Sequence, residues 1–176
     1  MTETLMEIMV RDYKTSDYEA CRSLWGELAQ HHADIYGDAA IAGDDPGRGF
    51  DEYLKRADLC GSWIAEYKEK IVGFVGLLDT VGNEGVAEIE PVITTASLRN
   101  EGVGTRLIER VINEAKIRGF RFLSIRPELR NERAFDLYVR LGFDKIGAVE
   151  LFQELSPASD RKWKAGIKIH NRELSY

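Results

Sequence analysis

Two carboxylates in an otherwise apolar stretch are the first residues of this chain that suggest chemistry. Glu88 and Glu90 lie within residues 86–95, whose composition is typical of a β-strand, and alternate residues of a strand point to one face. A carboxylate there is costly unless it has a partner or lies near water, so we expect both at the edge of a site. Such a glutamate can take a proton, directly or through a water, or hold a cation. The alternative is that either one only solvates the edge of the sheet.

The segment that follows, residues 97–105, has the composition of an anion-binding turn. It contains Arg99, Gly102 and Gly104 in the spacing Arg-x-x-Gly-x-Gly, and an amphipathic helical pattern begins at Val103. Glycines allow the backbone to approach a ligand closely, and the first N–H groups of a helix lack partners within it. With the helix dipole and the charge of Arg99, they predict a phosphate or pyrophosphate site. The spacing differs from the dinucleotide-binding Gly-x-Gly-x-x-Gly, and a P-loop lysine is missing.

This turn and two later motifs together resemble the GNAT superfamily of acetyl-CoA-dependent N-acetyltransferases. The turn resembles the family's Gln/Arg-x-x-Gly-x-Gly/Ala loop, which binds the pyrophosphate of acyl-CoA. Residues Asn131 to Tyr138 match Asn-x-x-Ala-x-x-x-Tyr, and Leu141-Gly142-Phe143 matches the Leu-Gly-Phe that follows. The matches occur in the family's order and at its intervals, within residues 63–149.

The resemblance implies a role for each matched residue. Glu88 corresponds to a general base, Glu90 could equally bind a cationic acceptor, and Tyr138 would protonate the departing CoA thiolate. Without the resemblance, Tyr138 could be a packed core aromatic and Asn131 only a helix cap. The residues expected to bind acetyl-CoA are Val92, Ile93 and Thr94 through main-chain groups, the loop residues Arg99, Asn100, Glu101, Gly102, Val103, Gly104 and Thr105, and Asn131 at the pantetheine arm.

Two departures from the family's pattern affect this loop. Many relatives have Val-x-Pro before the arginine, whereas this chain has Thr94-Thr95-Ala96, so we expect a less rigid start of the loop. Glu101 lies where relatives often carry a lysine, and its charge weakens the positive potential beside the phosphates.

The elements that must position these residues follow from hydrophobic periodicity. Together with the resemblance, this pattern implies a GNAT-like α/β (α+β) domain over residues 1–176, with a mixed, mostly antiparallel sheet of six or seven strands flanked by about four helices. Ser16 and Glu19 predict a capping box, and Gly73 and Gly76 predict a bulge or a close backbone approach. Strands are expected at 6–10, 62–67, 71–78, 86–95, 122–126, 143–151 and 163–170, helices at 17–32, 50–59, 103–118 and 131–141, and loops or turns at 33–50, 68–70, 80–85 and 156–160.

Composition limits the function classes. The chain has 176 residues, a formal net charge of −6 and 44% hydrophobic residues, as in a soluble globular domain. That charge offers no general field for nucleic acid, no segment approaches the roughly 20 apolar residues that span a bilayer, and residues 1–9 lack a secretory signal pattern. We therefore expect a cytoplasmic protein that binds neither nucleic acid nor a membrane. Cys21 and Cys60 have no metal-ligand spacing and no base placed to activate them, so we expect no metal site.

These observations predict an N-acetyltransferase whose partners are acetyl-CoA and an amine acceptor, a small molecule or a protein; a homodimer is left open. A different class is a non-catalytic acyl-CoA-binding regulatory module, because the binding loop is clearer than the catalytic residues. A third is another kind of nucleotide-binding protein, which would bind ATP or NAD without competition by CoA.

Overall fold

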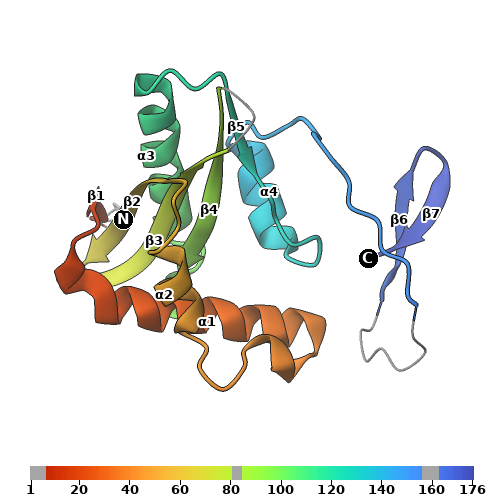
Figure 1. The fold of residues 1–176 in the computed structure, drawn as a ribbon, viewed down its shortest axis with the longest axis horizontal. Coiled ribbons are helices and arrows are strands. Elements are labelled where there is room, and N and C mark those ends of the chain that lie inside the picture. Colours follow the sequence, from red (N-terminus) through yellow and green to blue (C-terminus); the bar gives the residue numbers. More distant parts are fainter. Residues whose placement is uncertain (1–6, 81–84, 156–162) are drawn as a thin grey trace, which may run out of the picture.

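A five-stranded sheet forms the centre of the computed structural model, which describes residues 7–80, 85–155 and 163–176 (Figure 1). The strand order is β1-β2-β3-β4-β5, and neighbours are antiparallel except for β4 and β5, which are parallel. This mixed sheet with flanking helices confirms the predicted fold class. The bounds are β1 Met9–Asp12, β2 Leu59–Tyr67, β3 Lys70–Asp79, β4 Val86–Thr94 and β5 Phe122–Ile125.

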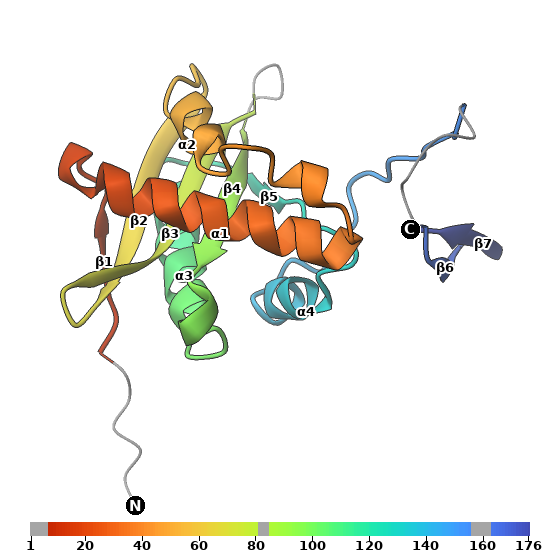
Figure 2. The same ribbon diagram turned by 90° about the horizontal axis from the view of Figure 1, so that it is seen from below.

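Helices cover both faces of the sheet. In the part of the chain that the structure describes, α1 and α2 lie over one face, and α3 and α4 over the other (Figure 2). None of the described helices is long and apolar enough to cross a membrane. The bounds are α1 Tyr18–Tyr36, α2 Arg48–Tyr53, α3 Val103–Ile117 and α4 Glu132–Arg140, with short 3₁₀ turns η1 Thr15–Asp17, η2 Ala39–Ile41 and η3 Ala96–Leu98.

Two hydrophobic cores separate these layers. The core under α3 includes Leu107, Ile108 and Val111 on the predicted apolar face of that helix, and it extends to Tyr138 of α4. The core under α1 and α2 is rich in aromatic rings, with Phe50 stacked on Tyr53 and meeting Phe74 edge-on. The sheet is therefore held from both sides, which fixes β4 between the two cores.

The glycines of β3 mark a bulge in β4, as the sequence predicted. Val75 pairs with Val92 and Leu77 with Ile89, so Gly76 alone faces the two residues Glu90 and Pro91. A Cβ on Gly76 would lie 2.0 Å from the Tyr53 hydroxyl and 2.4 Å from the Glu90 carbonyl oxygen. Only glycine therefore fits opposite the bulge. The Glu90–Pro91 peptide bond is cis.

The start of α1 differs from its predicted capping box. The helix begins at Tyr18 after η1, and the box between Ser16 and Glu19 does not form. Asp17 turns its carboxylate back instead, accepting from Lys14 N at 2.8 Å and from Arg11 Nη1 at 2.7 Å. The capping box that does form belongs to η1, between Lys14 and Asp17, and α1 itself has no side-chain cap.

The C-terminal part of the chain corrects the predicted strand count. Residues 143–151 form no strand, and Ile146 and Val149 are exposed, because β-prone side chains need a neighbouring strand to pack on. The strand expected at 163–170 is β6, Ala165–Ile169, which pairs with β7, Arg172–Ser175, in a separate two-stranded sheet. The central sheet therefore has five strands rather than six or seven, and the β6–β7 hairpin lies apart from it in both views (Figures 1 and 2).

Other boundaries shift by a few residues. The first strand is Met9–Asp12 rather than 6–10, and α1 continues to Tyr36, where Gly37 ends it at a φ of 66°. The helix expected at 50–59 is the shorter α2, which starts at Arg48 and ends at Tyr53. The predicted loop at 156–160, and the turn at 80–85 in part, lie outside the described residues. That the whole chain is one domain stays a prediction.

Candidate active site

The glycine turn after β4 leads directly into α3, and its geometry is that of an open anion site. Gly102 has a φ of 83°, a conformation that favours glycine, and Asn100 has a φ of 70°. The first helical hydrogen bond runs from Arg106 N to the Gly102 carbonyl at 3.0 Å, so the N–H groups of residues 103–105 have no acceptor within the helix. In the described chain, Arg99 has no carboxylate partner. Positive potential is thus available at the position predicted for the pyrophosphate.

Gly104 brings three elements together at this point. A Cβ on Gly104 would lie 3.2 Å from Leu137 Cδ2 on α4 and 3.6 Å from Thr94 Oγ1 at the end of β4. The start of α3, the end of β4 and the inner side of α4 therefore converge, although they are distant in the sequence. A larger side chain here would intrude where the three meet.

Beside this point, β4 exposes main-chain groups that no strand uses. Pairing with β5 ends at Ile89 opposite Ile125, so no strand of the described chain lies beside residues 90–94 on that side. Along an antiparallel strand, residues whose main-chain groups bond to the neighbouring strand alternate with residues whose groups face away from it. Thr95 is of the first kind, because its N–H donates to the Val72 carbonyl of β3 at 2.9 Å. It follows that Ile93 directs its main-chain groups toward β3, while Val92 and Thr94 direct theirs toward the open side. Of the three residues expected at the pantetheine arm, these two have groups free to pair with its amides.

The carboxylate of Glu27, a residue that the sequence did not single out, holds the start of the turn from α1. Its Oε2 atom accepts from Ala96 N at 2.9 Å and from Thr95 Oγ1 at 3.0 Å. One helical turn further along, His31 Nδ1 lies 3.5 Å from Arg99 Nη1. Burial, together with the charges of Arg99 and His32, lowers the pKa of His31, which favours its neutral form. The contacts of Glu27 restrain the start of the turn, which we expected to be less rigid because Thr94-Thr95-Ala96 lacks the family's proline.

Glu88 is buried within the sheet and has a cationic partner. The residue is 8% exposed, and its Oε2 atom lies 2.6 Å from Arg126 Nη2, just beyond the end of β5. Across the sheet it is opposite Leu78 of β3, a residue of the core under α1 and α2. Arg126 itself is 81% exposed in its side chain, so this ion pair opens to solvent at one end.

Glu90 occupies the bulge and is far more accessible. Its side chain is 47% exposed, and its Oε1 atom lies 3.7 Å from Arg56 Nη1. A hydrogen bond to Asp58, with the charges of Glu90 and Glu88, raises the pKa of Arg56. The charges of both glutamates therefore act on Arg56, but the two side chains differ in accessibility.

Tyr138 and Asn131 lie on α4 in two different settings. Burial raises the pKa of Tyr138 to about 12, and among the described residues its hydroxyl has no hydrogen-bond partner. Asn131 caps α4, because its Oδ1 atom accepts from Ala134 N at 3.2 Å. Within the described chain its side-chain nitrogen has no acceptor. Both residues thus keep one polar group that a ligand could use.

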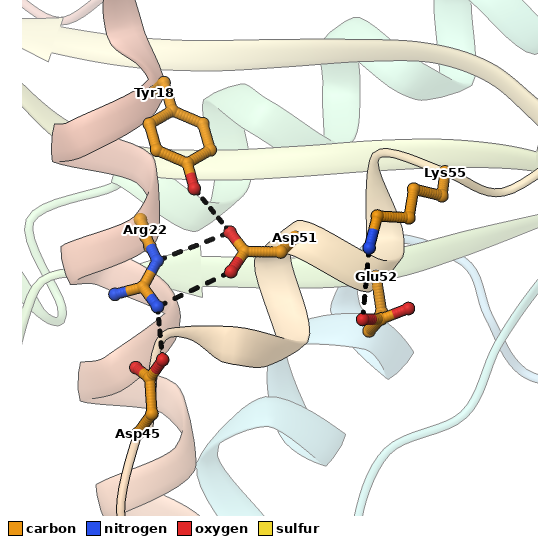
Figure 3. A network of polar contacts seen from close by, with 6 residues as sticks. All are labelled: Tyr18, Arg22, Asp45, Asp51, Glu52 and Lys55. Carbon is orange, nitrogen blue, oxygen red and sulfur yellow. Dashed lines mark hydrogen bonds and ion pairs between the residues drawn. The ribbon is translucent and has the colours of Figure 1, made fainter.

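The segment between α1 and α2 is fixed rather than loose (Figure 3). Arg22 of α1 binds Asp45 at 2.5 Å and Asp51 at 3.3 Å, and the Tyr18 hydroxyl donates to Asp51 at 2.6 Å. The hydrogen bond from Tyr18 lowers the pKa of Asp51. A Cβ on Gly49 would lie 2.2 Å from Trp25 Nε1, so α2 packs closely on α1. These contacts make this part of the chain a packed element of the fold, although the sequence predicted only a loop at 33–50.

Sequence reasoning missed the partners of the site more than the site itself. Pro91 was available as a signal, because a proline inside a strand pattern indicates an edge or a bulge. Nothing in the sequence places Glu27, Arg56 or Arg126 near the turn or the glutamates, since those contacts join distant segments. Burial raises the pKa of Cys21 to about 12, so this thiol is not a ready nucleophile.

Comparison with known proteins gives this arrangement its context. The sequence matches the acetyltransferase (GNAT) family over residues 11–143. It is 32% identical over 121 residues to an uncharacterized N-acetyltransferase of Methanocaldococcus jannaschii, a match that covers 58% of this chain and 54% of that protein. The chain thus spans about half the length of the curated relatives it matches.

Solved structures show the same fold. An aminoglycoside N-acetyltransferase, AAC(6')-Iy, in complex with a bisubstrate analogue containing CoA, is 22% identical with a TM-score of 0.64, and the match covers 84% of this chain and 98% of that one. A ribosomal-protein-alanine N-acetyltransferase from Brucella melitensis is 20% identical with a TM-score of 0.63, covering 79% and 86%. At these identities the similarity concerns the fold alone. Because the family match extends over more than half of the sequence, the chain belongs to the GNAT acetyltransferase family.

Proposed function

We propose that this protein transfers the acetyl group of acetyl-CoA to a primary amine by direct attack in a ternary complex. The observation that carries the proposal is the convergence at Gly104. There the start of α3, whose first N–H groups have no acceptor within the helix, meets the end of β4, where the main-chain groups of Val92 and Thr94 face the side that β5 leaves open. Arg99 of the same turn has no carboxylate partner among the described residues. A donor with a pyrophosphate at one end and peptide-like amides at the other matches this arrangement.

The chain's own residues then supply the proton transfers. A primary amine with a pKa near 10.4 is mostly protonated at neutral pH, so a base must remove a proton before the nitrogen attacks the thioester carbon. Glu88 or Glu90 takes that proton, directly or through water. As the new C–N bond replaces the C–S bond, the nitrogen releases its second proton to water, and CoA departs as a thiolate whose sulfur accepts a hydrogen bond from the Tyr138 hydroxyl. Glu90, which is exposed, also suits the binding of a cationic acceptor.

The class of acceptor is the finer part of the proposal. Relatives of this fold act on an aminoglycoside in one case and on a ribosomal protein in another, so both a small amine and a protein amine are candidates. The carboxylates around β4 favour a cationic amine in either case. A location in the cytoplasm, and the absence of nucleic acid and membrane from its partners, stay predictions.

A non-catalytic acyl-CoA-binding module is the second candidate. The observation that favours it is that both glutamates already have arginine partners, with Glu88 only 2.6 Å from Arg126. CoA release in the presence of a panel of amines separates an enzyme from such a module. Competition by CoA against ATP and NAD separates both from another nucleotide-binding protein.

The test of the proposal is a substitution at Gly104. We expect Gly104→Asp to weaken acetyl-CoA binding severely, because a carboxylate would repel the pyrophosphate at the start of α3. Gly104→Asn is the matched control, since it adds nearly the same volume without the charge. Calorimetry on the folded variants should find the Asn variant clearly tighter than the Asp variant. Wild-type affinity in Gly104→Asp would refute the proposed donor site.

We also propose that the chain forms a homodimer through residues 144–155. Five apolar side chains are exposed along this segment, and Ile146 and Leu155 are 84% and 86% exposed. A second copy of the chain would remove these apolar side chains from water. Sedimentation of a single monomeric species at micromolar concentrations would contradict this.

A further inference from the structure

A carboxylate of α1 anchors the point where β4 ends and the glycine turn begins. Glu27 Oε2 accepts from Ala96 N at 2.9 Å, and the Thr95 hydroxyl lies 3.1 Å and 3.0 Å from the two carboxylate oxygens. These contacts join residues 68 and 69 positions apart in the sequence. Hydrogen bonds to an ionised acceptor are about twice as strong as those between neutral groups.

The position of these contacts matters more than their number. Thr95 N donates to Val72 O at 2.9 Å, the last bond that ties this chain segment to β3. Ala96 N, one residue later, has no strand beside it, and Glu27 supplies its acceptor. The chain then turns through η3, where Leu98 N donates to the Thr95 carbonyl at 3.1 Å, and reaches Arg99. Glu27 therefore contacts the chain at the point where the turn departs from the sheet.

The charge of Glu27 is unfavourable for an anion site. A carboxylate near a pyrophosphate repels it, and α1 could have presented a neutral acceptor at this position. Its retention here is explained by geometry, since it holds a backbone N–H and a hydroxyl at once. One helical turn along α1, His31 Nδ1 lies 3.5 Å from Arg99 Nη1, and the charge of Arg99 helps to lower the pKa of this imidazole.

We propose that Glu27 is a positioning residue for the acetyl-CoA loop. By fixing Thr95 and Ala96 from α1, it sets the position of Arg99 and of the first N–H groups of α3. This inference rests on the proposed function, because it assumes that the loop binds acetyl-CoA. It assigns no contact between Glu27 and the donor.

Two substitutions separate a positional role from an electrostatic one. Glu27→Ala removes the acceptor, and we expect about a tenfold rise in the Kd of acetyl-CoA, the effect of losing one charge-assisted hydrogen bond. Glu27→Gln removes the charge but keeps an acceptor oxygen, so its Kd should stay within about threefold of wild type. If Glu27 acted only through its charge, both variants would bind acetyl-CoA more tightly than wild type. Glu19→Ala, an exposed glutamate on the same helix, is the matched control.

The second arm acts on the partner instead. Thr95→Val removes the hydroxyl while keeping the shape of the side chain, and it should raise the Kd of acetyl-CoA by about threefold. When Thr95→Val is combined with Glu27→Ala, it should raise the Kd of acetyl-CoA little further, because the carboxylate that the Thr95 hydroxyl contacts is already absent. The KM for acetyl-CoA should rise in these variants, while kcat at saturation and the KM for the amine stay close to wild type.

Calorimetry and thermal unfolding on all variants decide the outcome. If wild type binds acetyl-CoA while Glu27→Ala and Thr95→Val bind it equally well, the inference is wrong and the proposed function stands. If wild type binds no acetyl-CoA, the proposed function fails and the inference fails with it. Should Glu27→Ala not fold, Thr95→Val alone carries the decision.

Discussion

Replacing Tyr138 with phenylalanine isolates one hydroxyl group in the buried part of the site. Among the described residues this hydroxyl has no hydrogen-bond partner. The ring packs in the core under α3 and meets the Phe143 ring edge-on, with 6.3 Å between the two ring centroids. Removing a buried hydroxyl that has no partner costs the fold little. We therefore expect Tyr138→Phe to change the free energy of unfolding by less than about 1 kcal/mol.

The expected loss of rate follows from the acidity of the group. Burial raises the pKa of Tyr138 to about 12, whereas a free thiol has a pKa near 8.5. Complete transfer of the proton from Tyr138 to the thiolate therefore costs about 5 kcal/mol, the free energy that corresponds to a pKa difference of about 3.5. The hydroxyl should instead donate a hydrogen bond as charge develops on sulfur, an interaction of about 1.5–3 kcal/mol. The predicted decrease in kcat is about 10- to 100-fold.

The assay combines single-turnover rates with acetyl-CoA binding. Tyr138→Phe should bind acetyl-CoA as wild type does and lose rate in the chemical step. The wild-type profile of kcat should show no decrease from this tyrosine below about pH 10, because the hydroxyl stays protonated there. Full activity of the variant when chemistry limits turnover would refute this role and leave Tyr138 a core residue.

The remaining predictions concern carboxylates. Glu88→Gln should depress kcat/KM most at low pH, where free amine is scarcest, and Glu90→Gln should mainly raise the KM of a cationic amine. Both variants should stay folded, because the Arg126 side chain that Glu88→Gln leaves without its ion pair is 81% exposed, and the Glu90 side chain is itself 47% exposed. If pH-dependent kinetics gave the two effects to the opposite variants, the base would be Glu90. Arg11 and the Lys14 N–H lower the pKa of the buried Asp17 below 3.8, so its stabilising effect is present above that pH and is lost as the pH falls through the lowered value. Asp17→Asn should lower the free energy of unfolding by about 2–3 kcal/mol at pH 7 and flatten its decrease below pH 4, as denaturant titrations at several pH values will show.

The local part of the site could be predicted from the sequence because local rules govern it. Gly102 is needed for its positive φ and begins a helix whose apolar face is readable from its period, and Asn131 caps the next helix. Gly73 and Gly76 indicated a close approach, and a Cβ on Gly73 would lie 2.8 Å from Leu107 Cδ1. Each of these features depends on a few adjacent residues and on backbone conformation.

Contacts between distant segments were beyond such rules. The ion pair between Glu88 and Arg126 requires that β5 lies parallel to β4 and that β5 ends at Ile125, one residue before Arg126. No local pattern specifies this arrangement. Residues 143–151 have the composition of a strand, but a strand forms only where a neighbour accepts its hydrogen bonds. Composition therefore predicted β-structure there that the described chain does not form.

The bulge at Glu90 and Pro91 explains why alternation along β4 could not be followed through the site. Ile89 packs in the core under α3, yet Ile93, which simple alternation places on the same face, packs in the core under α1 and α2. On β3, Val75 and Leu77 stay on one face, so the change belongs to β4 alone. The extra residue lets one strand present Glu88 toward the side of α1 and α2 and still turn the main-chain groups of Thr94 toward the side that β5 leaves open. In a straight strand of the same sequence the main-chain groups of Thr94 would face β3 instead, so the bulge is what puts the proposed base and the proposed donor contacts on one element.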